Sequence, residues 1–350
     1  MSPMTTSDVK KNNKQALLRH IYENESSQQQ VLCELLHLSR PTVINAIVFI
    51  PDSKISIGVE LLQDSYEITA IDLYGNTICT ACYEIGFVNE DSYFRNICNS
   101  ITHFISGNKI DHKKILGVGI VLQGLISADG TTVTYGKILN CTGLHISVFT
   151  DHLPYPCKFF HDAEAAAQFE LWSHPSLKDF IYLNIRSHLS GALIVNRSSL
   201  KGTDLKSGVF EHMTLIPNGR PCYCGRRGCM ETYCSTQPLI DVTGHLHTFF
   251  EELRKGNRTC QECWNTYLLN LAAAINNLRM FIDYPVLIGG TLSPYLTEED
   301  IDTLHRYASE KSAFPTEQRF IRQGQNQKAL RCEGAAISYV KEYLHEIMNL

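Results

Sequence analysis

The chain has 350 residues, of which 44% are hydrophobic and 19% are charged, as in folded globular proteins and unlike disordered ones. This length exceeds one ordinary hydrophobic core and predicts two or three domains. The formal net charge of -5 excludes a general attraction to nucleic acid, so any contact with DNA has to be local.

Two features indicate a cytoplasmic protein without a membrane segment. No uninterrupted apolar run reaches the roughly 18–20 residues that cross a bilayer. The N-terminal sequence MSPMTTSDVKKNNKQ is polar and lacks the apolar core of a signal peptide. The thirteen cysteines are therefore expected to be mostly reduced thiols, which disfavours a disulfide-linked fold.

Residues 11–50 are predicted to form three short helices. The apolar residues at helical spacing in the first two are Leu17, Leu18, Ile21, Val31, Leu32 and Leu35. The third helix begins at Ser39 as its N-cap and has Pro41 in its first turn, where a missing N–H costs nothing. Because this is the layout of a helix-turn-helix, we assign residues 1–50 to a DNA-binding head.

The third helix is the predicted recognition helix of this head. Its exposed face is expected to present Arg40, Thr42 and Asn45 to DNA, with Ser39 available to a phosphate. Backbone contacts are expected from Lys10, Lys11, Lys14 and Arg19. Residues 1–50 carry five basic and four acidic side chains, so the predicted affinity is modest. A head that contacts only proteins is the alternative.

The hydrophobic pattern changes from helical to strand-like near residue 54. ISIGVELL, SYEITAIDLYG and NTICTACYEI predict an antiparallel meander. The elements expected after it are, in order, a helix near 91–106, the strand ILGVGIVL, a helix near 144–153, the strand CKFF, the helix DAEAAAQFELW, the strands FIYLNI and GALIVN, a long helix near 262–282, the strand PVLIGG, a helix after Ser293 and an amphipathic helix near 327–347. This order predicts a two-lobed α/β body behind the head.

A dense cysteine cluster follows the second series of strands. Cys222, Cys224 and Cys229 occur in the pattern C-x-C-G-x-x-G-C, and His212 precedes them by ten residues. The two glycines allow a sharp turn that brings the sulfurs together. Zinc prefers four nitrogen and sulfur ligands in a tetrahedral structural site, so we expect these four residues to bind Zn²⁺. Ordinary reduced thiols are the alternative.

Two other cysteine pairs have the spacing C-x-x-C. Cys79 and Cys82 fall in a predicted strand, where side chains three residues apart point to opposite faces. Cys260 and Cys263 have no histidine or further cysteine near them in the sequence. We expect neither pair to bind a metal.

The segment HMTLIPNGRPCYCGRRGCMETY resembles the signature of the ROK family, which groups sugar-responsive repressors and sugar kinases. FFHDAEAAAQFE, GIVLQGLISADGTTVTYG, VLIGGTLS and EGAAISYV resemble further segments of the family pattern. A helix-turn-helix joined to such a body is the layout of the repressor branch, which includes the N-acetylglucosamine and xylose repressors. The resemblance spans nearly the whole chain.

This resemblance implies an actin-like fold of the sugar-kinase type. Its first lobe is expected at residues 54–165, completed by a C-terminal helix at 325–350, and its second lobe at 166–324 with the cysteine loop. It also implies a homodimer or homotetramer. In the family pattern a sugar is bound by the positions that correspond here to Asp162, His212 and Glu231, with His161 adjacent. Asp162 occupies the position of the catalytic base of the kinases.

The chain departs from the kinase pattern where ATP phosphates bind. Ser56 replaces the aspartate of the first phosphate loop, at residues 55–61, and RSHLSGAL lacks most glycines of the second, at residues 185–192. Close approach of a phosphate needs backbone amides without side chains in the way. In the sugar-binding segment, Val209 replaces a glutamate and Glu211 replaces a glycine. The β-wing that usually follows the head of family repressors is absent or vestigial.

These observations favour a transcriptional regulator that binds operator DNA and senses a sugar or sugar phosphate in a zinc-supported cleft, without catalysis. Phosphoryl transfer depends mainly on positioning the phosphates, which the altered loops do not favour. A sugar kinase with Asp162 as base and a kinase-dead module that binds proteins are the alternatives. A sugar pocket that no longer binds any ligand is a further alternative, because of Val209.

Overall fold

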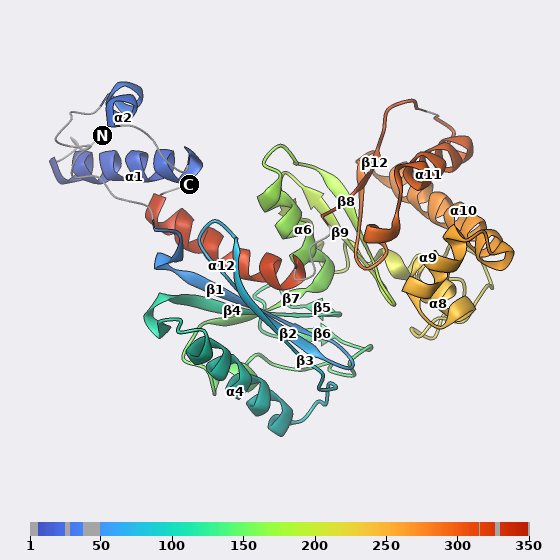
Figure 1. Cartoon of the computed structure of the whole chain (residues 1–350), viewed down its shortest axis with the longest axis horizontal. Helices are drawn as coiled ribbons and strands as arrows, with labels where there is room; N and C mark the ends of the chain where they lie inside the picture. The colour runs from blue at the N-terminus through green and yellow to red at the C-terminus, as the bar shows by residue number, and fades with distance from the viewer. Residues whose placement is uncertain (1–5, 25–28, 38–49, 315, 326–329, 349–350) are drawn as a thin grey trace.

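The computed structural model of the protein describes residues 6–24, 29–37, 50–314, 316–325 and 330–348, and only the backbone of residues 6–11, 14 and 29–31. A helical head lies beside one end of an α/β body that is divided into two lobes (Figure 1). Among the described residues, no helix is long and apolar enough to cross a membrane.

The described part of the head consists of α1 (Thr6–Asn24) and α2 (Gln29–Leu36). Leu17 and Leu32 bury against each other between the two helices, as the helical spacing predicts. Leu18 instead packs against the body, and Leu35 is 59% exposed, so the two expected apolar faces are only partly used within the head. The predicted third helix lies outside the described residues.

Lobe 1 contains a five-stranded sheet in the order β3-β2-β1-β4-β7. Its strands are β1 (Ile55–Leu61), β2 (Tyr66–Ile71), β3 (Thr77–Tyr83), β4 (Ile115–Leu122) and β7 (Cys157–His161). The first three are antiparallel, which confirms the predicted meander, whereas β4 and β7 run parallel to β1. One face is covered by α4 (Asp91–Gly107), which buries Phe94, Ile97 and Ile101.

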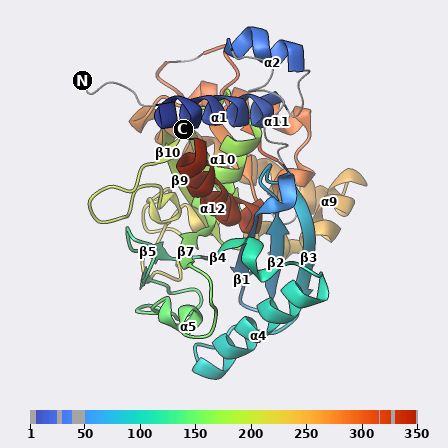
Figure 2. The same cartoon turned by 90° about the vertical axis from the view of Figure 1, so that its left-hand side faces the viewer.

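The C-terminal helix α12 (Leu330–Met348) crosses the other face of this sheet. Close packing requires glycine at the crossing, since a Cβ on Gly58 of β1 would collide with the carbonyl of Cys332, and one on Gly334 with the carbonyl of Ala165. The small residues of EGAA in α12 thus let helix and sheet approach closely. This contact joins the end of the chain to lobe 1 (Figures 1 and 2).

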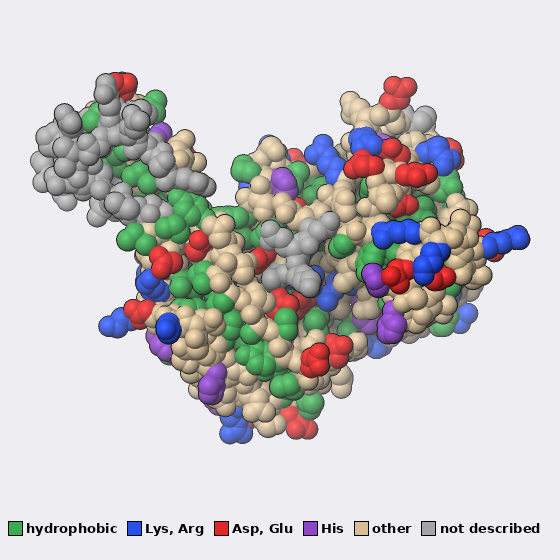
Figure 3. All heavy atoms as spheres, viewed as in Figure 1, with side chains coloured by type: hydrophobic (Ala, Val, Ile, Leu, Met, Phe, Trp, Pro, Cys, Tyr) green, Lys and Arg blue, Asp and Glu red, His purple; other side chains and the backbone are tan. Residues whose placement is uncertain are grey.

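Lobe 2 contains a second five-stranded sheet in the order β10-β9-β8-β11-β12. Its strands are β8 (Phe180–Ile185), β9 (Leu189–Val195), β10 (Ser198–Ser199), β11 (Val286–Gly289) and β12 (Ile321–Gln323). Helices α10 (Arg258–Phe281) and α11 (Glu298–Lys311) pack together in this lobe. Arg319 pairs with Glu298 and Asp302 of α11. Acidic and basic side chains lie side by side in the region of α11 in Figure 3.

Helix α6 (Asp162–Ser173) lies between the lobes and packs against α12 and against β8 and β9. Its alanines at 163, 166 and 167 are buried in one cluster with Tyr182 of lobe 2 and Ile337 of α12. Because small side chains line its length, α6 contacts both lobes closely. The expected lobe boundary at residues 165 and 166 lies within this helix.

The structure differs from the predicted elements in one shortened helix and in several short elements that were missed, including strands β10 and β12. The helix expected near 144–153 is reduced to α5 (Ser147–Thr150), because residues 141–144 form a turn with Gly143 at a positive φ of 87°. Helices α7 (Glu231–Cys234), α8 (Gln237–Thr243) and α9 (Leu246–Arg254) were not predicted from the sequence. A short hairpin of β5 (Leu125–Ile126) and β6 (Val133–Tyr135) was also missed; it lies beside the cleft between the lobes.

Candidate functional site

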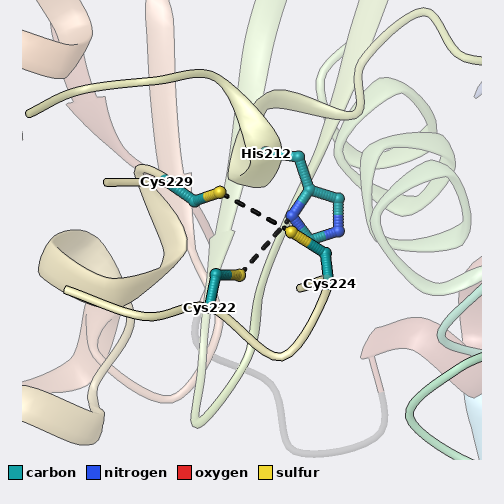
Figure 4. Close-up of side chains that lie close together, drawn as sticks. All are labelled: His212, Cys222, Cys224 and Cys229. Carbon is teal, nitrogen blue, oxygen red and sulfur yellow. Dashed lines mark hydrogen bonds between the residues drawn. The ribbon is translucent and has the colours of Figure 1, made fainter. Parts of the chain in front are cut away.

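The four predicted metal ligands converge at one point in lobe 2 (Figure 4). His212 ends the short 3₁₀ helix η3 (Phe210–His212), and the three cysteines come from the loop that follows. Their ligand atoms all lie within 4.8 Å of one another. The Nδ1 atom of His212 is 3.8 Å from the Sγ atom of Cys222, and the Sγ atoms of Cys224 and Cys229 are 3.7 Å apart.

Local backbone geometry holds this loop in place. Gly225 and Gly228 both have a positive φ, of 91° and 81°, and a Cβ on Gly228 would collide with the carbonyl of Ile216. The backbone N–H of Cys222 donates to the carbonyl of Arg226, which closes the turn. The glycines are therefore required by the turn, as their spacing predicts.

The donor set has the chemistry of a metal site. Burial lowers the pKa of His212, which favours the neutral imidazole that can act as a ligand. Three thiols and one imidazole form a soft set of four donors, and such a set is typical of a closed tetrahedral site. This cluster can hold a metal ion. Among the described residues, it is also the only such group of histidines, cysteines and carboxylates that lies close enough to do so.

A cavity of about 1040 Å³ opens next to this cluster, between the two lobes. Lobe 1 lines it with the segment after β4 and with the β6 hairpin, including Tyr135 and Lys137. Lobe 2 contributes Ser190 of β9 and the segment from Val209 to Thr214. A ligand bound in this cavity would therefore contact both lobes.

The four predicted sugar-binding residues occupy different positions relative to this cavity. His161 and His212 line it, whereas Asp162 and Glu231 do not. The Asp162 carboxylate is fully buried and accepts hydrogen bonds from Ser190 Oγ and Asn184 Nδ2, both at 2.9 Å. Asp162 therefore contacts the cavity wall through Ser190 and through His161, whose Nε2 atom lies 3.5 Å from the Asp162 carboxylate.

Glu231 is engaged within lobe 2. Its carboxylate accepts a hydrogen bond from the backbone N–H of Leu189 at 2.7 Å and lies 2.8 Å from Nδ1 of His188. Tyr223 packs edge-on against the rings of His188 and His212, with both pairs of centroids 5.2 Å apart. Glu231 thus connects the loop that carries the three cysteines to the turn between β8 and β9.

Glu211, which the sequence analysis noted only as a replaced glycine, lines the cavity directly. Its side chain is buried, and its Oε2 atom makes no hydrogen bond with any residue that the structure describes. Burial raises the pKa of this carboxyl group well above its usual value, and the nearby Asp162 and Glu231 add to the effect. A carboxyl group here can accept hydrogen bonds from a ligand.

A buried ion cluster joins the two segments that the family resemblance assigns to the kinase phosphate loops. Glu60 of β1 accepts from Arg186 Nη1 at 2.7 Å, and from Arg331 Nε and Nη2 at 2.6 and 2.8 Å. Arg186 follows β8 in lobe 2, and Arg331 lies in the first turn of α12. Burial by itself would raise the pKa of Glu60, but the two arginines hold it at about 2. We call Glu60, Arg186 and Arg331 the Glu60 cluster.

The predicted DNA-contacting residues Ser39, Arg40, Thr42 and Asn45 lie outside the described residues, as do the side chains of Lys10, Lys11 and Lys14. Arg19 is described, and its Nη2 atom donates to the carbonyl of Met348 at 3.5 Å. Arg19 therefore contacts the end of α12, beside which α1 lies in Figure 2. The sequence analysis had assigned it to the DNA backbone.

A two-lobed α/β body with a histidine–cysteine loop beside its cleft defines a protein of the sugar-kinase fold class. Residues 56–329 match the sequence model of the ROK family, and the chain belongs to the ROK family.

Known proteins similar to this chain include both regulators and kinases. The xylose repressor of Bacillus subtilis (strain 168) is 26% identical over 262 residues, covering 66% of this chain and 68% of that protein. A solved ROK family transcriptional regulator, a homolog of the E. coli MLC protein, superposes with a TM-score of 0.77 at 16% identity and covers 97% of this chain and 98% of its own. A ROK family glucokinase from Streptomyces griseus superposes with a TM-score of 0.69 at 18% identity and covers 81% of this chain and 98% of its own. These matches confirm the predicted actin-like fold.

Proposed function

We propose that this protein is a sugar-responsive transcriptional regulator that binds operator DNA through its head and does not phosphorylate sugars. The observation that carries the proposal is the Glu60 cluster, because it joins with ion pairs the two segments that hold ATP phosphates in related kinases. The solved regulator also matches 97% of the chain, including the region of the head, whereas the glucokinase matches 81%. The protein is expected to act in the cytoplasm as a homodimer or homotetramer, since two heads read two half-sites.

The argument against catalysis is electrostatic. Kinases stabilise the charge of a transferring phosphoryl group with preorganised amides, cations and metal ions. Here the positive charge of Arg186 and Arg331 is shared with the buried Glu60, and bulky residues occupy the second loop. Asp162, the base of the kinase alternative, is held by Asn184 and Ser190. A sugar kinase is the alternative function, because the solved glucokinase is similar in fold.

His212, Cys222, Cys224 and Cys229 would hold Zn²⁺ as a structural ion. Four protein ligands leave no position open for water, so the ion would stabilise the loop and supply no catalysis. With the imidazole fixed by the ion, His212 would keep its place in the wall of the cavity. Closure of the lobes on a sugar or sugar phosphate would then be transmitted through this loop to the rest of the body.

Helix α6 offers a route from the cavity to the head. Its first residue, Asp162, is bonded to Ser190 in the cavity wall, and its penultimate residue, Trp172, lies beside the head. A rigid helix of 12 residues transmits a shift at one end to the other. Binding in the cavity would therefore alter the position of the head and its affinity for DNA.

Two assays on the purified protein test this function together. A gel shift with the DNA upstream of its own gene should show salt-dependent binding that a sugar or sugar phosphate changes. A coupled assay for ADP release should show no sugar-dependent turnover, with the Streptomyces griseus glucokinase as positive control. Sugar-dependent ADP release without DNA binding would reverse the assignment in favour of a kinase.

A further inference from the structure

The position of Glu211 follows from its neighbours in the chain. Gly208 adopts a positive φ of 91°, which turns the backbone into η3. Phe210 is buried against β9, where a Cβ on Gly191 would collide with its ring. His212 is turned toward the cysteines. With both neighbours anchored, the side chain of Glu211 is left facing the cavity, which it lines.

The surroundings of Glu211 leave one oxygen of its carboxyl group without a hydrogen-bond partner. The residue is 8% exposed, and Oε2 has no hydrogen-bond partner among the described residues. The neighbouring carboxylates, Asp162 and Glu231, are committed to their own donors. A buried, unpaired acceptor destabilises the folded chain, and such groups occur mainly at sites that bind or react. Glu211 therefore has the properties of a group completed by a ligand.

We propose that Glu211 is the carboxylate that accepts hydrogen bonds from the hydroxyl groups of the bound sugar, in place of position 209. This inference rests on the proposed function of the cavity as a sugar sensor. A carboxylate has two oxygens and can accept from two adjacent hydroxyl groups of one ring. Val209 lines the same cavity and presents an apolar surface to the C–H face of the ring.

The shift of the acceptor by two residues determines which ring edge is read. His161 and Ser190 line the cavity with Glu211 and supply further polar atoms. Asp204 at the cavity rim is exposed and pairs with Lys206 at 3.3 Å, so it is already satisfied. Glu211 is thus the buried carboxyl group of this cavity that remains available, and the exposed Glu262 of α10, which does not line the cavity, provides a matched control.

The test measures the affinity of the intact, zinc-loaded protein for D-xylose, D-glucose, N-acetyl-D-glucosamine and their phosphates by calorimetry. For the sugar that binds, Glu211→Gln should weaken binding by about 10- to 100-fold, because one acceptor oxygen is replaced by an NH₂ group that only donates, and a buried sugar hydroxyl loses its partner. Glu262→Gln should change this affinity less than about twofold. The double variant Val209→Glu with Glu211→Gly should regain binding or change the preferred sugar.

Two further readouts separate ligand contact from a structural role. Glu211→Gln should leave the zinc content and the melting temperature of the sugar-free protein unchanged, because no described residue pairs with Oε2 of Glu211. A monodeoxy analogue of the bound sugar that weakens binding to the wild type should bind Glu211→Gln as well as the parent sugar does. A structural role predicts a lower melting temperature and no such analogue.

The outcomes are distinct for the two proposals. If a sugar binds wild type and Glu211→Gln equally, the role of Glu211 is overturned while the sensor function stands. If wild type binds none of the sugars or phosphates, the cavity is not a sugar site, and both proposals fail. If the melting temperature of Glu211→Gln falls and its zinc is lost, the residue is structural, and the inference is overturned.

Discussion

Tyr22 of the head stacks face to face on Tyr74 of the body, with ring centroids 5.0 Å apart and planes 7° from parallel. Tyr22 Oη donates to the carbonyl of Leu73 at 3.2 Å. Trp172, at the end of α6, donates from Nε1 to the carbonyl of Tyr74 at 2.6 Å and packs edge-on against Tyr22. The head therefore contacts the same helix that begins with Asp162 near the cavity.

We expect Tyr22→Ala to weaken the communication between cavity and DNA. Loss of the aromatic pair should cost about 0.5–1.5 kcal/mol of contact energy at this joint. Sugar affinity should stay within about twofold of wild type, whereas the effect of the sugar on DNA affinity should shrink. The control is Phe281→Ala, which removes an 81% exposed aromatic ring of lobe 2. An unchanged sugar response in Tyr22→Ala would show that coupling takes another path.

We expect Cys229→Ser to abolish metal binding. Cys229 is fully buried in the cluster, and a structural zinc can supply on the order of 10 kcal/mol of apparent binding free energy. Elemental analysis should find about one zinc per wild-type chain and almost none in the variant, with a marked fall in melting temperature. Cys263→Ser, in a C-x-x-C pair outside the cluster, should keep the metal. If Cys229→Ser and Cys263→Ser contain equal amounts of zinc, the prediction that Cys229 is a zinc ligand is wrong.

We expect acid to weaken the Glu60 cluster in a defined range of pH. The folded-state pKa of Glu60 is about 2, below its ordinary value of 4.5, so ionisation stabilises the fold above pH 4.5. This contribution, roughly 3 kcal/mol, is lost as the pH falls from 4.5 toward 2.

The variant that tests this is Glu60→Gln, which leaves Arg186 and Arg331 buried without their carboxylate. At pH 7 it should lower the free energy of unfolding by about 3–5 kcal/mol. Denaturant titrations at several pH values should show that the difference in free energy of unfolding between wild type and variant becomes smaller below pH 4.5. A difference that is independent of pH would mean that the charge of Glu60 contributes little. Glu262→Gln, on the exposed face of α10, is the control.

We expect Arg40→Ala to reduce DNA binding by the head. Arg40 is predicted to face DNA from the third helix, and loss of one base-contacting side chain typically costs about 1–3 kcal/mol. Gel shifts at several salt concentrations should show weaker binding than wild type. The control is Arg258→Ala, which removes an exposed arginine of α10 in lobe 2. Equal binding by wild type and Arg40→Ala would remove the recognition-helix assignment.

Local spacing in the sequence determined the histidine–cysteine cluster and most of the body. The four candidate ligands fall within 18 residues, and Gly225 and Gly228 restrict the turns between them, so their convergence needs little long-range information. The meander was equally predictable, because alternation within each strand and short turns specify antiparallel neighbours. Helices α8 and α9 were missed because their periodic apolar stretches are short.

Only the tertiary structure decided which side chains reach the cavity and which are already paired. Glu60 and Arg331 are 271 residues apart in sequence, and the crossing of α12 over β1 brings them together. Asp162 and Glu231 matched the family's positions, but Ser190, Asn184 and Leu189 engage their carboxylates. Glu211 faces the cavity because Phe210 packs on β9. Such pairings depend on which surfaces come into contact when the lobes fold, and spacing along the sequence does not specify these long-range contacts.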